Sequence, residues 1–153
     1  MARRLVAVVA ALVLLVEAVG FVALNGIMAA FVDAQEMSLA GLETDAMVAG
    51  TWAMGIATGL FLALCGGTLA LAGLRDRAPG RITRILLISC AVTHGVLGSL
   101  TVGLVGWYAF GFMMVVLALV VASLIAYGKE REPLAPTPED RPGAAPTNGA
   151  APA

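Results

Sequence analysis

Three polar side chains interrupt long apolar stretches of this sequence: Glu17, Asn25 and His94. A carboxylate and an imidazole that meet away from water can exchange a proton or bind a cation near neutral pH, because burial and a close partner both alter their titration. The same residues could instead form a hydrogen bond between helices that fixes their packing, worth about 1 kcal/mol. The residue types leave both interpretations open.

Helix geometry places the glutamate and the histidine at a similar depth. Glu17 follows Leu5 by twelve residues, about 18 Å at 1.5 Å per residue, near the middle of a hydrocarbon core roughly 30 Å thick. His94 lies about 15 Å from Arg84 on the same count. An unpaired carboxylate at such depth is costly. We therefore expect Glu17 to face a bundle interior, where it could meet His94, with Asn25 either joining a polar track or serving as a packing residue.

The sequence lacks the motifs that several other kinds of catalytic or metal-binding site require. Cys65 and Cys90 sit in apolar runs without CxxC spacing and are expected to pack as small hydrophobes. One histidine cannot supply bis-histidine haem ligation, and no Glu-x-x-His motif, glycine-rich phosphate loop or nucleophile elbow is present. The acidic residues within 33–46 could bind a divalent cation loosely, although a solvated loop is the simpler interpretation. We expect no enzyme activity, cofactor or metal.

Composition and hydropathy identify the elements that must position these residues. The chain is 60% hydrophobic and 12% charged, whereas soluble domains are about a quarter charged. Its mean hydropathy is +0.95. Segments of membrane-spanning length predict an all-α four-helix transmembrane bundle, residues 1–128, with spans at about 5–32, 47–74, 85–104 and 107–127. Residues 129–153 hold six of the seven prolines and are predicted to form a disordered cytoplasmic tail, which could also dock a partner.

The first apolar segment also has features of a signal peptide. Arg3 and Arg4 precede the apolar run from Leu5 to Val16, and Ala18 could mark a cleavage site. The run continues to Val32, however, about twice the length that a signal peptide needs, so we expect a span.

Charge predicts the orientation of the bundle. All nine basic residues fall on one side of a four-span arrangement, which places both termini in the cytoplasm of a multi-pass cell-membrane protein. The aromatic residues Trp52, Trp107 and Tyr108 fall at the predicted outer boundary and Tyr127 at the inner one. The scattered basic residues form no basic face, which excludes nucleic acid as a partner. The basic loop 75–84 is expected to meet anionic lipid head groups.

Small residues four apart predict how the spans pack. In lipid, helices associate where small side chains allow close approach. The second span has such a ladder at Gly55, Gly59, Ala63 and Gly67, and the third at Ala91, Gly95, Ser99 and Gly103. We expect the second and third spans to pack along these ladders, with crossings near −40°. The alternative is that one ladder is the seam of a homo-oligomer.

Two resemblances bear on function. Length, residue bias and the Pro-Ala-rich tail resemble the uncharacterised small four-span integral membrane proteins of high-GC actinobacteria. The segment LLVEAVG around Glu17 is similar in placement to the essential glutamate of small multidrug-resistance transporters, which exchange protons for cationic drugs. The long acidic loop, one-sided charge and tail depart from that family, and we do not assign the chain to it.

Two functions are therefore predicted from different classes. The first is a non-enzymatic accessory or interaction protein that binds the lipid bilayer and other membrane subunits, or forms a homo-oligomer. The second is a small proton-coupled transporter that uses Glu17, together with His94. An enzyme acting on lipids or quinones is the third and least supported alternative.

Overall fold

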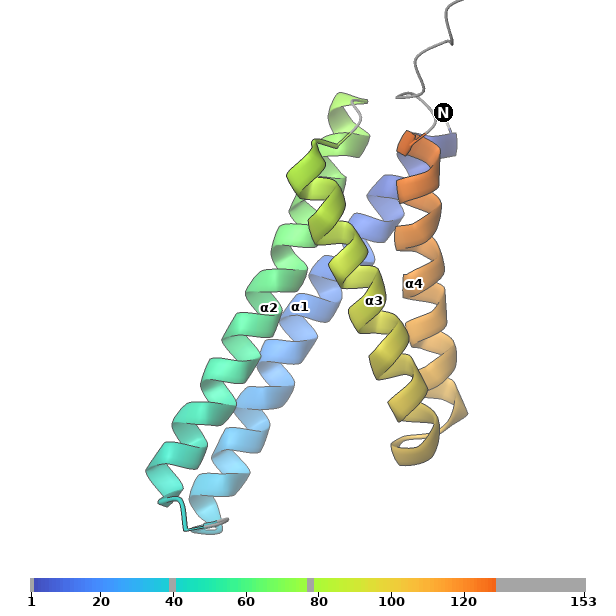
Figure 1. Ribbon diagram of the computed structural model, residues 1–153. Coiled ribbons are helices and arrows are strands. Elements are labelled where there is room, and N and C mark those ends of the chain that lie inside the picture. The colour runs from blue at the N-terminus through green and yellow to red at the C-terminus, as the bar shows by residue number, and fades with distance from the viewer. Residues whose placement is uncertain (1, 39–40, 77–78, 129–153) are drawn as a thin grey trace, which may run out of the picture.

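The computed structural model of this chain describes residues 2–38, 41–76 and 79–128 (Figure 1). Within these residues it contains four α-helices and no strands. They are α1 (Ala2–Ala34), α2 (Thr44–Arg75), α3 (Arg81–Leu104) and α4 (Trp107–Gly128). Each helix is long and apolar enough to cross a membrane. The prediction of an all-α protein with four such helices is confirmed, whereas the predicted tail 129–153 lies outside the described residues.

The ends of the helices follow from local backbone conformation. The residue after α2, Asp76, adopts the left-handed region with φ 50, a conformation that commonly ends helices. Between α3 and α4 the chain turns at Gly106, whose φ of 114 disfavours residues with a side chain. The two residues Val105 and Gly106 thus suffice to join two antiparallel helices.

The helices form two hairpins that lie close together at one end and diverge at the other (Figure 1). The α1–α2 hairpin is packed along its length, and α3 packs on α4. Near the N-terminal end of α1, α4 also packs on α1, whereas α2 and α3 make little contact. The prediction that the second and third spans form the tight pair is therefore wrong: α2 pairs with α1.

The glycines of α2 explain this pairing. The buried residues Gly55, Gly59, Leu62, Gly66, Leu69 and Gly73 follow alternating spacings of four and three, which keep side chains on one face of the helix. Spacings of four alone rotate by about 40° at each step. The predicted ladder therefore leaves the interface at Gly67, where an added Cβ would meet nothing within 4 Å.

Contacts across this face place α1 directly against the α2 glycines. A Cβ on Gly55 would lie 2.5 Å from Asn25 Cβ, one on Gly59 would overlap Val22, and one on Gly66 would lie 3.1 Å from a carbonyl oxygen of α1. On α3, the glycine that approaches α4 is Gly98, where a Cβ would lie 2.6 Å from a methionine side chain of that helix. Gly98 is not a member of the predicted α3 ladder.

The hydrophobic core occupies the end where the hairpins meet. Its members come from the first half of α1, the second half of α2, the first half of α3 and the middle of α4: Ala10, Ala11, Leu14, Ala18, Leu62, Cys65, Leu69, Leu87, Cys90, Val116 and Val120. Both cysteines are free thiols in this core, as the sequence predicted. Beyond it, toward the α1–α2 loop, the hairpins separate.

Candidate functional site

Glu17 of α1 and His94 of α3 meet close to the hydrophobic core, since Ala18 follows Glu17 and Cys90 lies one turn before His94. His94 Nε2 lies 3.0 Å from Glu17 Oε2, and the exposed fractions of the two side chains are 4% and 9%. The contact joins α1 to α3, which otherwise approach each other little. The similar depths predicted for these two residues are thus matched by direct contact in the structure.

The hydrogen bond made by the second imidazole nitrogen determines which atoms of the Glu17–His94 pair carry protons. His94 Nδ1 is 2.9 Å from the carbonyl oxygen of Cys90, one turn earlier in α3. A carbonyl oxygen only accepts hydrogen bonds, so Nδ1 carries a proton and donates it. The Nε2–Oε2 contact then needs one further proton, held either by a neutral glutamic acid or by an imidazolium paired with a carboxylate. In both forms the pair has no net charge.

This arrangement also excludes activation of the nearby thiol. Cys90 Sγ lies 3.6 Å from His94 Nδ1, and a cysteine, histidine and glutamate in this order resemble a nucleophile with its base and orienting group. Nδ1, however, is already the donor to the Cys90 carbonyl, so it has no lone pair to accept the thiol proton. The arrangement does not provide a base for Cys90.

One oxygen of the glutamate has no partner in the described part of the chain. Glu17 Oε1 is buried and makes no hydrogen bond there, an arrangement that costs about 1–3 kcal/mol for an ordinary buried polar atom. A cavity of about 290 Å³ is lined by Glu17 and His94 and otherwise mainly by apolar side chains of all four helices. Buried acceptors without a partner are rare in native proteins, so this one calls for an explanation.

Asn25 does not join this site. Its side-chain Nδ2 donates a hydrogen bond to the Phe21 carbonyl of its own helix at 2.9 Å. Its Cβ lies on the α1–α2 interface beside Gly55. Asn25 therefore acts in helix packing, one of the two roles considered for it.

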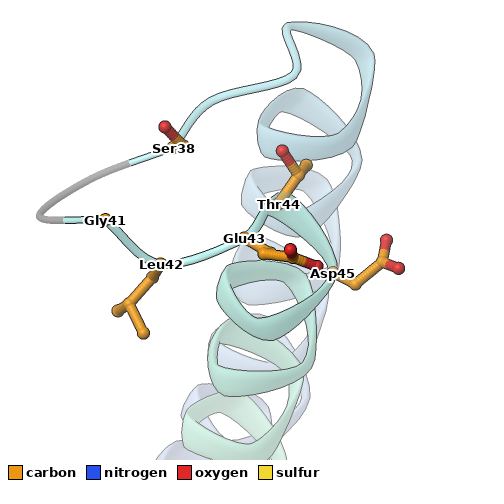
Figure 2. A pocket seen from close by; sticks show the side chains of 6 residues that line it. All are labelled: Ser38, Gly41, Leu42, Glu43, Thr44 and Asp45. Carbon is orange, nitrogen blue, oxygen red and sulfur yellow. The ribbon is translucent and has the colours of Figure 1, made fainter.

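The acidic loop between α1 and α2 forms an open hollow of about 450 Å³, lined by Ser38, Gly41, Leu42, Glu43, Thr44 and Asp45. Figure 2 shows that the two carboxylates lie on the α2 side and that Asp45 points away from the loop. Across the described residues there is no group of three or more His, Cys, Asp or Glu side chains that could hold a metal ion. Both interpretations of this loop, a solvated loop and a loose site for a divalent cation, stay predictions.

A second polar cluster, not found from the sequence, ties the ends of α1 and α2 together. Arg3 donates from Nε and from Nη2 to the two oxygens of Asp76, each at 3.0 Å, and its guanidinium lies 5.8 Å from the ring centre of Tyr127. Arg4 Nε donates to the Gly73 carbonyl at 3.0 Å, which satisfies a group that a helix end leaves unpaired. Hydrogen bonding from Arg3, with the nearby charge of Arg4, lowers the pKa of Asp76 below its ordinary value.

The function of this chain has to be argued from its own residues, because comparisons with known proteins found no matching protein-family model, curated protein or solved structure. Across the described residues the fold is all-helical, with four helices that are long and apolar enough for a multi-pass membrane protein.

Proposed function

We propose that this chain is a non-enzymatic accessory or interaction protein of the cell membrane, with both termini on the cytoplasmic side. The basic residues described in the structure support this orientation, because they gather at one end of the helices: Arg3 and Arg4 at the start of α1, Arg75 at the end of α2, and Arg81 and Arg84 at the start of α3. Such a one-sided charge distribution favours cytoplasmic placement.

The outward face of α3 carries the proposed interaction role. A Cβ added at Gly95 or Gly103 would meet no atom within 4 Å, and Ser99 between them is exposed. The Ser99 hydroxyl donates to the Gly95 carbonyl at 2.9 Å. Small residues give a helix little advantage against lipid tails but let a second helix approach closely. This face therefore suits a transmembrane helix of another membrane subunit.

Site-specific photo-crosslinking tests this role. A photoreactive phenylalanine analogue replaces Val96, which lies on the α3 face and is 56% exposed, or Val115 of α4, which is 58% exposed. In native membranes we expect a protein adduct from position 96 and only lipid adducts from position 115. The adduct mass separates another subunit from a second copy of this chain. Protein adducts of equal yield at both positions, or none at position 96, would contradict the proposal.

A small proton-coupled transporter is the second candidate, and the Glu17–His94 contact favours it. The pair holds one shared proton at zero net charge. Loss of that proton leaves a buried negative charge, which a cation entering the adjacent cavity would neutralise. Such replacement of a proton by a cation is the elementary event of proton-coupled exchange.

Proteoliposomes that contain a pH-sensitive dye test the transporter function. With the membrane potential clamped, addition of 4-hexylbenzylamine, a cation at neutral pH, should move protons across membranes that contain the wild-type chain. The Glu17→Gln variant should lose this flux, whereas Gly111→Leu, on an exposed position of α4 with open space around it, should retain it. Equal flux from wild type and Glu17→Gln, or none from wild type, rules this function out.

A further inference from the structure

The cavity beside Glu17 has one unmet hydrogen-bonding requirement. Glu17 is more than nine-tenths buried at its side chain, and its Oε1 has no partner in the described residues. Oε1 is an acceptor whether the shared proton lies on Oε2 or on the imidazole. Oε1 has almost no accessible surface, so a turn of the Glu17 carboxyl must first bring it to the cavity wall. A ligand that presents an O–H or N–H donor would then satisfy this oxygen.

The net charge of the Glu17–His94 pair favours a neutral hydrogen-bond donor over a cationic one. The Glu17–His94 pair is neutral while it holds its shared proton, and the remaining wall of the cavity is mainly apolar. A cation would add an uncompensated charge to this site unless the pair first released that proton, which costs free energy in an apolar environment. A neutral hydroxyl satisfies Oε1 without changing the charge of the site.

The residues that line the cavity and the volume of the cavity indicate the size and chemistry of the apolar part of the ligand. Phe21, Phe61 and Phe112 contribute rings from three different helices to the cavity wall, and aromatic rings pack well edge-to-face or offset against each other. A cavity of 150 Å³ is sufficient for benzene, so about 290 Å³ accommodates a substituted ring. These features favour an aromatic alcohol over an aliphatic one.

Access to the cavity is from the bilayer. Several lining residues, Val16, Leu24 and Phe112 among them, are also exposed on the lipid-facing surface. A ligand that enters this way must dissolve in the membrane. We propose that the cavity binds a membrane-soluble phenol, such as the hydroquinone head of a lipid-soluble quinol, whose hydroxyl donates to Glu17 Oε1.

Binding of matched aromatic probes to the full chain in lipid nanodiscs tests this proposal. The probes are 4-hexylphenol and 4-hexylanisole, which differ by the hydroxyl proton, and empty nanodiscs correct for partitioning into lipid. We expect the phenol to bind about tenfold more tightly, because a hydrogen bond to a charged or strongly polarised acceptor contributes to affinity on this scale. Equal affinities for the two probes would overturn the proposal.

Two glycine variants keep the test independent of the Glu17 side chain. An added Cβ at Gly20 would meet nothing within 4 Å, although Gly20 lines the cavity. Gly20→Leu should therefore fold, fill the cavity and weaken phenol binding at least tenfold, whereas Gly111→Leu should bind within twofold of wild type. Glu17→Leu should bind the phenol and the anisole equally. Unchanged phenol binding in Gly20→Leu would contradict the assignment.

Two further probes define the ligand class. Tighter binding of a decyl hydroquinone than of 4-hexylphenol would assign a quinol head group, and the reverse order a single-hydroxyl phenol. Displacement of the phenol by an equal concentration of 4-hexylbenzylamine would overturn the proposal in favour of a cation site. Phenol binding does not depend on the interaction role of α3, so failure of that role leaves this result separate. The transporter function places a cation in the same cavity and is therefore the competing assignment: flux driven by 4-hexylbenzylamine and lost in Glu17→Gln would count against the phenol.

Discussion

Replacing Glu17 and His94 by apolar residues of similar size, singly and together, should give strongly non-additive changes in stability. His94→Phe leaves both oxygens of a buried carboxyl without a partner, and Glu17→Leu leaves Nε2 of a buried imidazole unpaired. At about 1–3 kcal/mol for each orphaned group, we expect losses of about 2–3 and about 1–2 kcal/mol. The double variant has no orphaned group, and it also removes the unpaired Oε1. Its loss should be about 1 kcal/mol or less.

The interaction free energy of this cycle is therefore expected to favour the double variant by about 2–4 kcal/mol. Reversible unfolding by sodium dodecyl sulfate in bicelles, followed by circular dichroism, measures each term. Asn25→Ala combined with His94→Phe is the matched control, because Asn25 bonds only within its own helix among the contacts described, and these two changes should add. Additivity of the Glu17 and His94 changes to within about 0.5 kcal/mol would refute the paired arrangement.

Two further predictions concern helix packing and the ion pair between the start of α1 and the end of α2. Gly59→Leu forces a side chain into Val22 and should lower the free energy of unfolding by about 1–3 kcal/mol. Gly67→Leu, with open space around it, should be neutral or stabilising by up to about 1 kcal/mol; equal losses in the same unfolding assay would restore the predicted ladder. The lowered pKa of Asp76 beside Arg3 means that their ion pair stabilises the fold above the ordinary pKa of an aspartate. That contribution is lost as pH falls through the lowered value, so acid should destabilise wild type more than Asp76→Asn, and parallel pH profiles would contradict this.

Long apolar runs with few polar interruptions made the four helices predictable from the sequence. The similar positions of Glu17 and His94 along α1 and α3 were also predictable, because helical rise converts residue counts directly into distance. Depth alone did not establish the contact with His94, since two residues at equal depth meet only if both helices also turn them toward each other. That rotation is set by how all four helices pack, with α4 lying against α1.

The pairing of the helices was harder to predict for a related reason. A row of small residues shows that a helix can be approached closely but does not identify the neighbour. On α2, alternating spacings of four and three select Gly66 and Gly73 for the interface, whereas the uniform spacing of four selected Gly67. The alternation was present in the sequence and was the better signal.

The ion pair of Arg3 with Asp76 could not be predicted by counting the charges along the sequence. The one-sided distribution of basic residues placed both groups at the same membrane surface, but several arginines there were equally available. The left-handed backbone of Asp76 at the end of α2 brings its carboxylate to the start of α1. Turn geometry of this kind depends on the three-dimensional fold.

Nitrogen-15 NMR of the chain in lipid, with histidine labelled, tests the central claim most directly. His94 is the only histidine, so both imidazole nitrogens can be assigned without ambiguity. The structure predicts a protonated Nδ1 and an Nε2 resonance shifted by a shared proton, and Glu17→Leu should change the Nε2 resonance while Nδ1 stays protonated. Identical spectra from wild type and Glu17→Leu, or an imidazole protonated only at Nε2, would contradict a Glu17–His94 pair that holds one proton within the membrane.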